Sequence, residues 1–216
     1  NYIANASAPS SSGRTIPVID PSDGQVFDEI QRSNAQDIDA AVHAARQCHD
    51  AVWSKVSAAE RGRLLMKLSA KVAEHADELA AIEQRDCGKP TKQAKADALA
   101  LVRYFEFYAG AGDKLHGDTI PYLDGYSVLT WREPHGVTGH VIPWNYPMQI
   151  FGRSVGGALA AGNVCVIKPS EDACLSLLRV AELAAAVGFP AGAINIVTGY
   201  GHEVGDALAR HPGVDH

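Results

Sequence analysis

The sequence predicts an α/β fold in which a largely helical segment is followed by a Rossmann-like parallel sheet that is incomplete at its carboxyl end. The first observation is the helical spacing of apolar residues over much of residues 36–114. The second is a change after Gly136, where short apolar strands alternate with helical segments in three successive βα units. Such alternation indicates a parallel sheet covered on both faces. Between these regions, the extended residues 121–136 surround an LDG turn that predicts a β-hairpin.

The composition is that of an ordinary globular protein. Of the 216 residues, 46% are hydrophobic and 20% are charged, which is close to the globular average and excludes a disordered or fibrous class. The formal net charge of −6 comes without a cluster of Lys and Arg, so no nucleic-acid partner is expected. No apolar run approaches the roughly 20 residues that cross a membrane, and no signal-peptide pattern is present. We therefore expect a cytoplasmic protein without a membrane partner.

The cysteines and histidines show no metal-ligand spacing. The four cysteines form no CxxC pair and the nine histidines include no HExxH motif, so neither a disulfide framework nor a metal site is expected. Cys165 lies inside an apolar strand, where a small core residue is the favoured interpretation. Cys174 falls in the first turn of a predicted helix, where the pKa of a thiol can be lowered. A structural role is favoured for Cys174 as well.

The amino-terminal residues predict an arm followed by a hairpin. Residues 1–14 are small, polar and rich in Ser, and such a segment cannot bury enough apolar surface to offset the ordering of its backbone. We therefore expect a loose arm. Residues 15–20 and 25–31 flank the turn tetrapeptide PSDG, which predicts a β-hairpin.

Capping signals mark the ends of the predicted helices. Asn34 is a plausible cap for a first amphipathic helix. Ser57 and Glu60 form the capping-box pattern at the start of a second helical run. That run ends near Gly88, and a last helix extends over about residues 91–115.

The first strand of the βα region ends in VIPWNYP, which places an amide side chain at a strand end. Pro143 and Pro147 bracket Trp144 and Asn145, and the two prolines keep the backbone out of helix and restrict where the amide points. A side-chain amide can stabilise an oxyanion, and the loss of such a donor costs about 3 kcal/mol of barrier. The alternative is a turn Asn that satisfies its own backbone, and the local sequence alone favours this alternative.

The second strand ends in VIKPSE, at the edge where a dinucleotide fold reads the ribose. Lys168 can donate to ribose hydroxyls or meet a 2′-phosphate, whereas Glu171 can accept from both hydroxyls and would repel that phosphate. Glu171 therefore favours NAD over NADP. An ordinary solvated helix start explains the same residues equally well, because acidic residues are favoured in the first turn of a helix.

The third strand runs into VTGYGHEVGDAL, in which Gly199, Gly201 and Gly205 bring backbone close to any ligand at the start of a helix. A diphosphate is often held in this way. However, no GxGxxG follows the first strand, and glycines at turns need no ligand to explain them. The periodicity of the sequence alone neither establishes nor excludes a nucleotide site.

Taken together, the segments REPHGVTGHVIPWNYP, ALAAGN, VIKPSE, FPAGAINIVTGYG and VGDALARHPGV resemble, in order and spacing, the aldehyde dehydrogenase superfamily. The match runs from about Pro17 to His216. Each motif is weak alone, but PWN, AAGN, KPSE and GxxxG in register form a specific combination. The chain resembles the amino-terminal portion of such an enzyme.

The resemblance implies that the parent enzyme oxidises an aldehyde to a carboxylic acid with NAD, or alternatively NADP. The reaction of the family passes through a thiohemiacetal, hydride transfer to nicotinamide and hydrolysis of a thioester. By resemblance, Asn145 is the oxyanion-hole amide, Lys168 and Glu171 hold the adenosine ribose, and Gly201 and Gly205 border the diphosphate and adenine. The cofactor-binding residues expected from the resemblance are Ile142, Pro143, Trp144, Asn145, Lys168, Ser170, Glu171, Gly201 and Gly205.

The resemblance also implies a division of the chain. After the arm, residues 15–116 correspond to the helical part of the cofactor-binding domain and residues 117–135 to a bridging hairpin that joins subunits. Residues 136–216 correspond to incomplete NAD(P)-binding βα units. The implied partners are a small-molecule aldehyde and further copies of the subunit in a homodimer or homotetramer.

Two departures from the family pattern matter. The nucleophilic Cys, the general-base Glu and an FTGS-like turn of the family lie downstream of His216, and none of the four cysteines lies in the nucleophile motif. We therefore expect the 216-residue chain alone to be inactive, and poorly soluble because its sheet has an unpaired edge. Ser154 and Gly157 stand where many members carry Lys and Pro, so no proton-relay role is assigned there.

Two other functions fit the sequence. One is a non-catalytic nucleotide-binding or assembly subunit that keeps the hairpin and half of the cofactor fold. The other is an acyl-phosphate or acyl-CoA reductase that shares the cofactor architecture. The residues around the nucleophile of the missing half would separate these from an aldehyde dehydrogenase.

Overall fold

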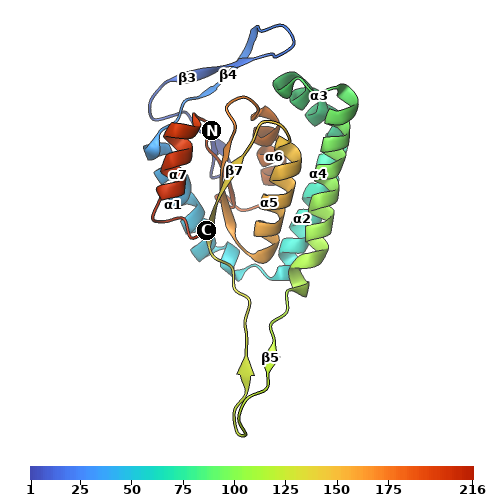
Figure 1. The fold of residues 1–216 in the computed structure, drawn as a ribbon, viewed down its shortest axis with the longest axis vertical. Helices are drawn as coiled ribbons and strands as arrows, with labels where there is room; N and C mark the ends of the chain where they lie inside the picture. Colours follow the sequence, from blue (N-terminus) through green and yellow to red (C-terminus); the bar gives the residue numbers. More distant parts are fainter.

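The computed structural model describes residues 1–216 and contains a five-stranded sheet between layers of helices (Figure 1). The strand order is β2-β1-β9-β8-β7, in which β2 is Ala6–Ser7 and β1 is Tyr2–Ile3. Strands β7 (Val137–Ile142), β8 (Val164–Pro169) and β9 (Ile194–Ile196) run parallel to their neighbours in this group. Every residue of β8 is buried, as expected for a strand covered on both faces. The predicted α/β fold is confirmed, with three parallel strands in a sheet that also contains the antiparallel pairs β1–β2 and β1–β9.

Helices lie on both faces of the sheet. Helix α1 (Ala35–Ala51) packs on one face, beside α7 (Asp206–Arg210). Helices α5 (Pro147–Ala161) and α6 (Leu175–Ala186) pack on the other face (Figure 1). The βα alternation in the sequence therefore produces the expected three layers.

Three further helices form an outer layer against α5 and α6: α2 (Ala58–Glu74), α3 (Ala76–Cys87) and α4 (Thr91–Ala111). Two short 3₁₀ turns, Trp53–Lys55 and Gly112–Lys114, connect this layer to the rest. No helix of the chain combines the length and the apolar character needed to cross a membrane.

The capping signals of the sequence are confirmed. Asn34 accepts from the backbone at the start of α1, and Ser57 and Glu60 form a complete capping box on α2. Gly88 ends α3 in the left-handed conformation, with φ at 70°. These signals involve residues within one turn of each other, which explains why local sequence predicts them.

The hairpin predicted around PSDG is also confirmed. Strands β3 (Thr15–Ile19) and β4 (Val26–Gln31) pair antiparallel, and Gly24 adopts a positive φ in the turn between them. The hairpin forms a small separate sheet at one end of the molecule (Figure 1).

The prediction of a loose arm for residues 1–14 is wrong. Two short strands in this segment extend the main sheet: β1 (Tyr2–Ile3) and β2 (Ala6–Ser7). Tyr2 pairs with Ile196 of β9 and is only 7% exposed, and the Asn1 side-chain oxygen accepts from the backbone of Thr198 at 2.9 Å. The arm is ordered because the edge of β9 satisfies its polar groups, and this contact is remote in sequence.

Two element boundaries in the βα region differ from the sequence prediction. The helix start that is one interpretation of the segment around Glu171 lies later, at Leu175, because residues 170–174 form a turn. The last helical segment starts as a π-helical turn at Gly201–Gly205 before α7. Both helices are present, and only the residues at which they begin differ.

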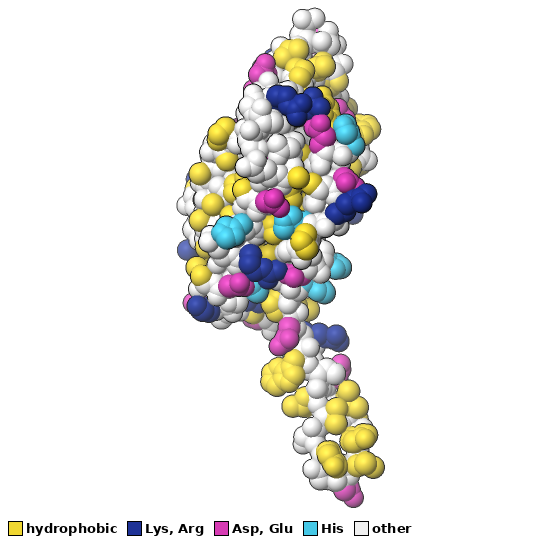
Figure 2. Space-filling view, turned by 90° about the vertical axis from the view of Figure 1, so that its left-hand side faces the viewer, with side chains coloured by type: hydrophobic (Ala, Val, Ile, Leu, Met, Phe, Trp, Pro, Cys, Tyr) yellow, Lys and Arg dark blue, Asp and Glu magenta, His cyan; other side chains and the backbone are white.

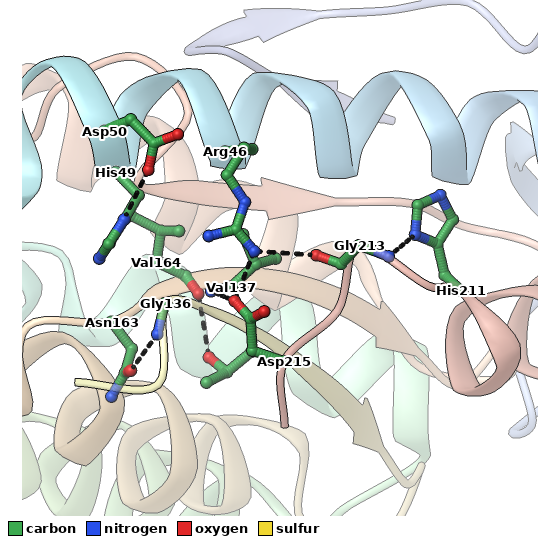
Figure 3. A network of polar contacts seen from close by, with 11 residues as sticks. Arg46, His49, Asp50, Gly136, Val137, Asn163, Val164, His211, Gly213 and Asp215 are labelled. Carbon is green, nitrogen blue, oxygen red and sulfur yellow. Dashed lines mark hydrogen bonds and ion pairs between the residues drawn. The ribbon is translucent and has the colours of Figure 1, made fainter. Parts of the chain in front are cut away.

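Polar contacts connect α1, the start of β7 and the last residues of the chain (Figure 3). The Asp215 carboxylate accepts from the Val137 backbone at 2.8 Å and from the Arg46 guanidinium at 2.5 Å. The Asp215 amide donates to the Val137 carbonyl, also at 2.8 Å, and the His216 carbonyl accepts from the Gly139 amide. The outer edge of β7, expected from the sequence to be unpaired, is therefore partly occupied.

β7 carries a histidine with a depressed pKa. Burial lowers the pKa of His140 to about 4, and the nearby His216 contributes to this shift. Since the unfolded chain takes up the proton first, near pH 6.5, stability is present above that pH and is lost as pH falls towards 4. We expect the wild-type chain to lose about 2 kcal/mol of unfolding free energy between pH 7 and pH 5 from this residue.

His140→Gln should flatten this part of the pH–stability profile, as measured by denaturant unfolding at several pH values. The matched control is His43→Gln, because His43 is exposed on α1. If the two variants have the same pH–stability profile, burial of His140 does not cause the acid sensitivity.

The hairpin expected near Gly125 is present and projects from the body of the molecule (Figure 1). Its strands are β5 (Thr119–Ile120) and β6 (Val128–Leu129). Hydrophobic side chains gather on it (Figure 2). The exposed large apolar residues of the hairpin are Ile120, Tyr122, Leu123, Tyr126, Leu129 and Trp131, which is 81% exposed.

Candidate cofactor and oxyanion site

The site lies where the three parallel strands end. The register pairs Ile142 with Pro169 and Ile167 with Ile196, so the carboxyl ends of β7, β8 and β9 lie at one edge of the sheet. The Ser170 amide donates to the Ile142 carbonyl at 2.7 Å, which joins the first two strand ends. This edge is where ligands bind in open α/β sheets.

The loop after β7 presents Asn145 to solvent. Trp144 and Asn145 are both exposed, whereas the side chain of Ile142 is 1% exposed and belongs to the core. The Trp144 carbonyl accepts from Cys87 and the Gln149 amide donates to a carboxylate, but the Asn145 side chain makes no hydrogen bond within the chain. A turn Asn that satisfies its own backbone, the alternative considered above, is not what the structure contains.

The predicted ribose-binding residues lie together. The Lys168 ammonium is 2.5 Å from the Glu171 carboxylate, and the Lys168 side chain is only 4% exposed. Gly201 lies beside this pair, since a Cβ atom added there would be 4.0 Å from Lys168 Nζ. The structure thus brings together residues from the ends of β8 and β9.

The Glu171 carboxylate is held in its charged form. Burial would raise its pKa, but the hydrogen bond from Lys168 and the Gly201 amide outweigh burial, so the pKa of Glu171 is lowered. A charged carboxylate accepts hydrogen bonds from hydroxyl groups and repels phosphate. Ser170 supports the same turn, because its hydroxyl accepts from the Asp172 amide at 3.3 Å.

The glycines after β9 differ in how much space surrounds their Cα atoms. No atom lies within 4 Å of a Cβ added at Gly205, so this position is open. Gly199 has φ at +150°, and a Cβ there would lie 2.4 Å from Val204. Packing therefore explains Gly199, whereas Gly201 and Gly205 leave backbone accessible to a ligand.

A cleft of about 500 Å³ lies next to these strand ends. Trp144, Glu171 and Tyr200, one from each strand end, form one side of it. The other side comes from the β3–β4 hairpin and from Asp86 and Cys87 at the end of α3. The cleft is large enough to hold part of a dinucleotide.

Buried charges that none of the sequence motifs indicates surround the site. Asp86 is 3% exposed, and burial raises its pKa to about 6 although the Leu175 amide donates to it at 2.8 Å. Glu83 and Asp97 are fully buried. The sequence does contain a signal for these buried charges. Glu83 and Asp86 lie on the same face of the helix as the buried Leu79, where an apolar residue is expected.

No thiol in the chain is activated. Burial raises the pKa of Cys48 to about 11 and those of Cys87 and Cys165 to about 12, and it also raises the pKa of Cys174 well above its usual value. Nucleophilic thiols have lowered pKa values, so the structural interpretation of Cys165 and Cys174 is supported. No group of three His, Cys, Asp or Glu side chains is arranged to hold a metal ion.

Ser154 and Gly157, which stand where many family members carry Lys and Pro, have local explanations. The Ser154 hydroxyl donates to the Ile150 carbonyl at 2.9 Å within α5. A Cβ atom added at Gly157 would lie 3.3 Å from the Tyr108 ring, so the aromatic ring occupies the space of a larger residue.

Comparison with known proteins identifies a family for the chain. The model of the aldehyde dehydrogenase family matches residues 8–216. A hydroxyisobutyraldehyde dehydrogenase from Mycolicibacterium austroafricanum is 47% identical over 99% of this chain and 42% of its own length. The chain thus spans less than half of the length of this relative.

Two solved structures have the same fold. A crystal structure from Burkholderia cenocepacia, assigned as an aldehyde dehydrogenase, is 69% identical with a TM-score of 0.99, covering 100% of this chain and 45% of that one. An NAD⁺ complex of the aldehyde dehydrogenase from Bacillus cereus is 38% identical with a TM-score of 0.97, covering 99% and 44%. A family match over nearly the whole chain, together with the strand-end site, shows that this chain belongs to the aldehyde dehydrogenase family.

Proposed function

We propose that the protein containing this chain oxidises an aldehyde to a carboxylic acid with NAD or NADP, and that the chain supplies part of the cofactor site and the oxyanion-hole amide. The observation that carries the proposal is the Asn145 amide, which is exposed and unbonded at the sheet edge that also holds Lys168 and Glu171. A donor without an internal partner is available to a developing oxyanion.

The cofactor would accept the hydride of the aldehyde. Lys168 and Glu171 would bind the ribose hydroxyls, with the ammonium as donor and the carboxylate as acceptor. Gly201 and Gly205 would allow close approach of the diphosphate, and Trp144 would provide an apolar wall. The remaining residues of the expected set, Ile142, Pro143 and Ser170, would act mainly by shaping the two strand ends.

The chain favours NAD over NADP in this proposal. A 2′-phosphate would meet the charged Glu171, whose pKa is lowered. Glu171→Gln removes this repulsion and keeps an acceptor for a ribose hydroxyl. We expect the ratio of kcat/KM for NADP to that for NAD to rise about tenfold, which corresponds to about 1.4 kcal/mol.

Asp172→Asn is the matched control for Glu171→Gln. Asp172 is the adjacent acidic residue, and it is exposed and makes no ion pair with Lys168. The ratio should stay near the wild-type value in this variant. An equal rise in both variants would mean that general charge, rather than the Glu171 contact, sets the preference.

The hairpin suggests how the protein assembles. Its six large apolar side chains are exposed in a single copy of the chain (Figure 2), and an exposed apolar patch of this kind marks a protein interface. We infer that it packs against another copy of the subunit in a homodimer or homotetramer.

The first test uses the natural protein that contains this chain. Its intact mass is measured, and reduction of NAD is followed by absorbance with and without an aldehyde. The proposal predicts a mass well above the 22.9 kDa of this chain and NAD reduction that depends on the aldehyde. A protein of 22.9 kDa that binds NAD without reducing it would support a non-catalytic subunit instead.

A further inference from the structure

Helix α5 begins at Pro147, two residues after Asn145, and lacks a side-chain cap of its own. Its N-cap residue, Tyr146, makes no side-chain capping hydrogen bond, so the first backbone amides of the helix need other acceptors. The Glu83 carboxylate of α3 accepts from the Met148 amide at 3.4 Å. A residue that is remote in sequence therefore performs the capping.

Glu83 belongs to a buried ionic cluster, which we call the Glu83–Lys89–Asp97 cluster. The Lys89 ammonium contacts both carboxylates and lies 2.6 Å from Asp97. Glu83 and Asp97 are fully buried, and the Lys89 side chain is 10% exposed. Asp97 also accepts from the Gln149 side chain at 2.7 Å. Two successive residues of the first turn of α5 are thus held by this cluster.

Contacts from the same region hold the residues on both sides of Asn145. The Lys89 ammonium lies 4.9 Å from the centroid of the Tyr146 ring, within the range of a cation–π interaction. The Cys87 thiol donates to the Trp144 carbonyl at 3.3 Å. The Asn145 side chain makes no such contact, so its position depends on the contacts of Trp144 and Tyr146 on either side.

Stability alone does not account for this cluster. A buried ion pair gains little or nothing over well-packed apolar residues, because each charge loses its hydration. Here two carboxylates share one ammonium, and burial raises the pKa of Glu83. The cluster is costly, and apart from hydrogen bonds from Gln93 and Ser176 its outward contacts are with the loop and helix turn that bear Asn145.

We propose that the Glu83–Lys89–Asp97 cluster positions the Asn145 amide for oxyanion stabilisation. The inference rests on the proposed function of Asn145. The cluster residues are positioning residues, since they touch Asn145 only through its neighbours. A displacement of about 1 Å in a catalytic group can cost on the order of 100-fold in rate, so a small shift of the loop is enough.

The test is a double-mutant cycle in the full protein that contains this chain. Lys89→Met is expected to lower kcat on the order of 10- to 100-fold, with KM for NAD within about twofold of the wild type because the ribose contacts are untouched. In an Asn145→Ala background, Lys89→Met should cause no further loss. Lys92→Met is the matched control, because Lys92 is exposed on the same helix as Asp97.

Each result of the cycle has a distinct meaning. If Asn145→Ala leaves kcat unchanged, the proposed function of Asn145 fails. If Asn145→Ala lowers kcat but Lys89→Met lowers it by the same factor in both backgrounds, or has no effect in either, the positioning role is overturned. Lys89→Met should also speed hydrogen exchange at the Met148 amide, which Lys92→Met should not.

A milder variant covers the case in which Lys89→Met does not fold. Gln149→Ala removes one hydrogen bond between α5 and Asp97 and leaves the ion pairs of Lys89 intact. We expect it to lower kcat several-fold in the wild-type background and not at all in the Asn145→Ala background. An equal loss in both backgrounds would overturn the positioning role.

Discussion

Asn145→Ala is expected to lower kcat of the protein that contains this chain by about 10²- to 10³-fold, as for the loss of one oxyanion-hole donor in other acyl-transfer enzymes. The physical reason is that the amide is fixed between two prolines and makes no competing hydrogen bond, so its full donor strength is available to the transition state. Steady-state kinetics with a saturating aldehyde would measure the effect.

The loss should be confined to the transition state. Because Asn145 is exposed and contributes no hydrogen bond to the folded chain, the melting temperature should remain near its wild-type value, and the dissociation constant for NAD should change far less than kcat. A change in kcat of less than about threefold, with a folded protein, would show that the amide does not stabilise the oxyanion.

Gly192→Ala is expected to destabilise the fold by about 2–5 kcal/mol, the sum of strain in the left-handed region and a steric clash. Gly192 has φ at +92°, and a Cβ atom would lie 2.4 Å from the Ala44 carbonyl oxygen and 2.9 Å from Cys48. Both contacts belong to α1, so the clash would separate this helix from β9. Denaturant unfolding would measure the loss of free energy.

Gly188→Ala separates the two causes. Gly188 has nearly the same φ, at +101°, but the nearest atom to an added Cβ is Leu64 Cδ2 at 3.8 Å. This variant should lose only the backbone term of about 1–2 kcal/mol. If Gly192→Ala were no more destabilising than Gly188→Ala, close packing between α1 and the turn before β9 would not be limiting.

Local sequence determines most of the elements of this protein. The Ser57–Glu60 capping box, the left-handed Gly88 and the PSDG turn all occur where the sequence predicts them, because each depends on hydrogen bonds or φ angles within a few residues. The alternation of apolar strands and helices likewise predicts the parallel sheet, since periodicity reports which faces are buried.

Sequence also indicated the residues of the candidate site, but only as separate motifs. Lys168 and Glu171 fit an ordinary helix start as well as a ribose site, and Asn145 fitted a turn that bonds to itself. The structure adds that Lys168, Glu171 and Gly201 meet at one sheet edge and that the Asn145 amide has no partner.

The remaining features of the fold, such as the ordered amino-terminal arm, depend on contacts between segments that are remote in sequence. The amino-terminal arm is ordered because Tyr2 joins the edge of β9, and the first turn of α5 is capped by Glu83 from another helix. A local sequence signal cannot predict such features, because a polar segment or a buried charge is unfavourable until a distant partner satisfies it. Folding brings that partner within hydrogen-bonding distance, which is why the arm and the Glu83–Lys89–Asp97 cluster are visible only in the tertiary structure.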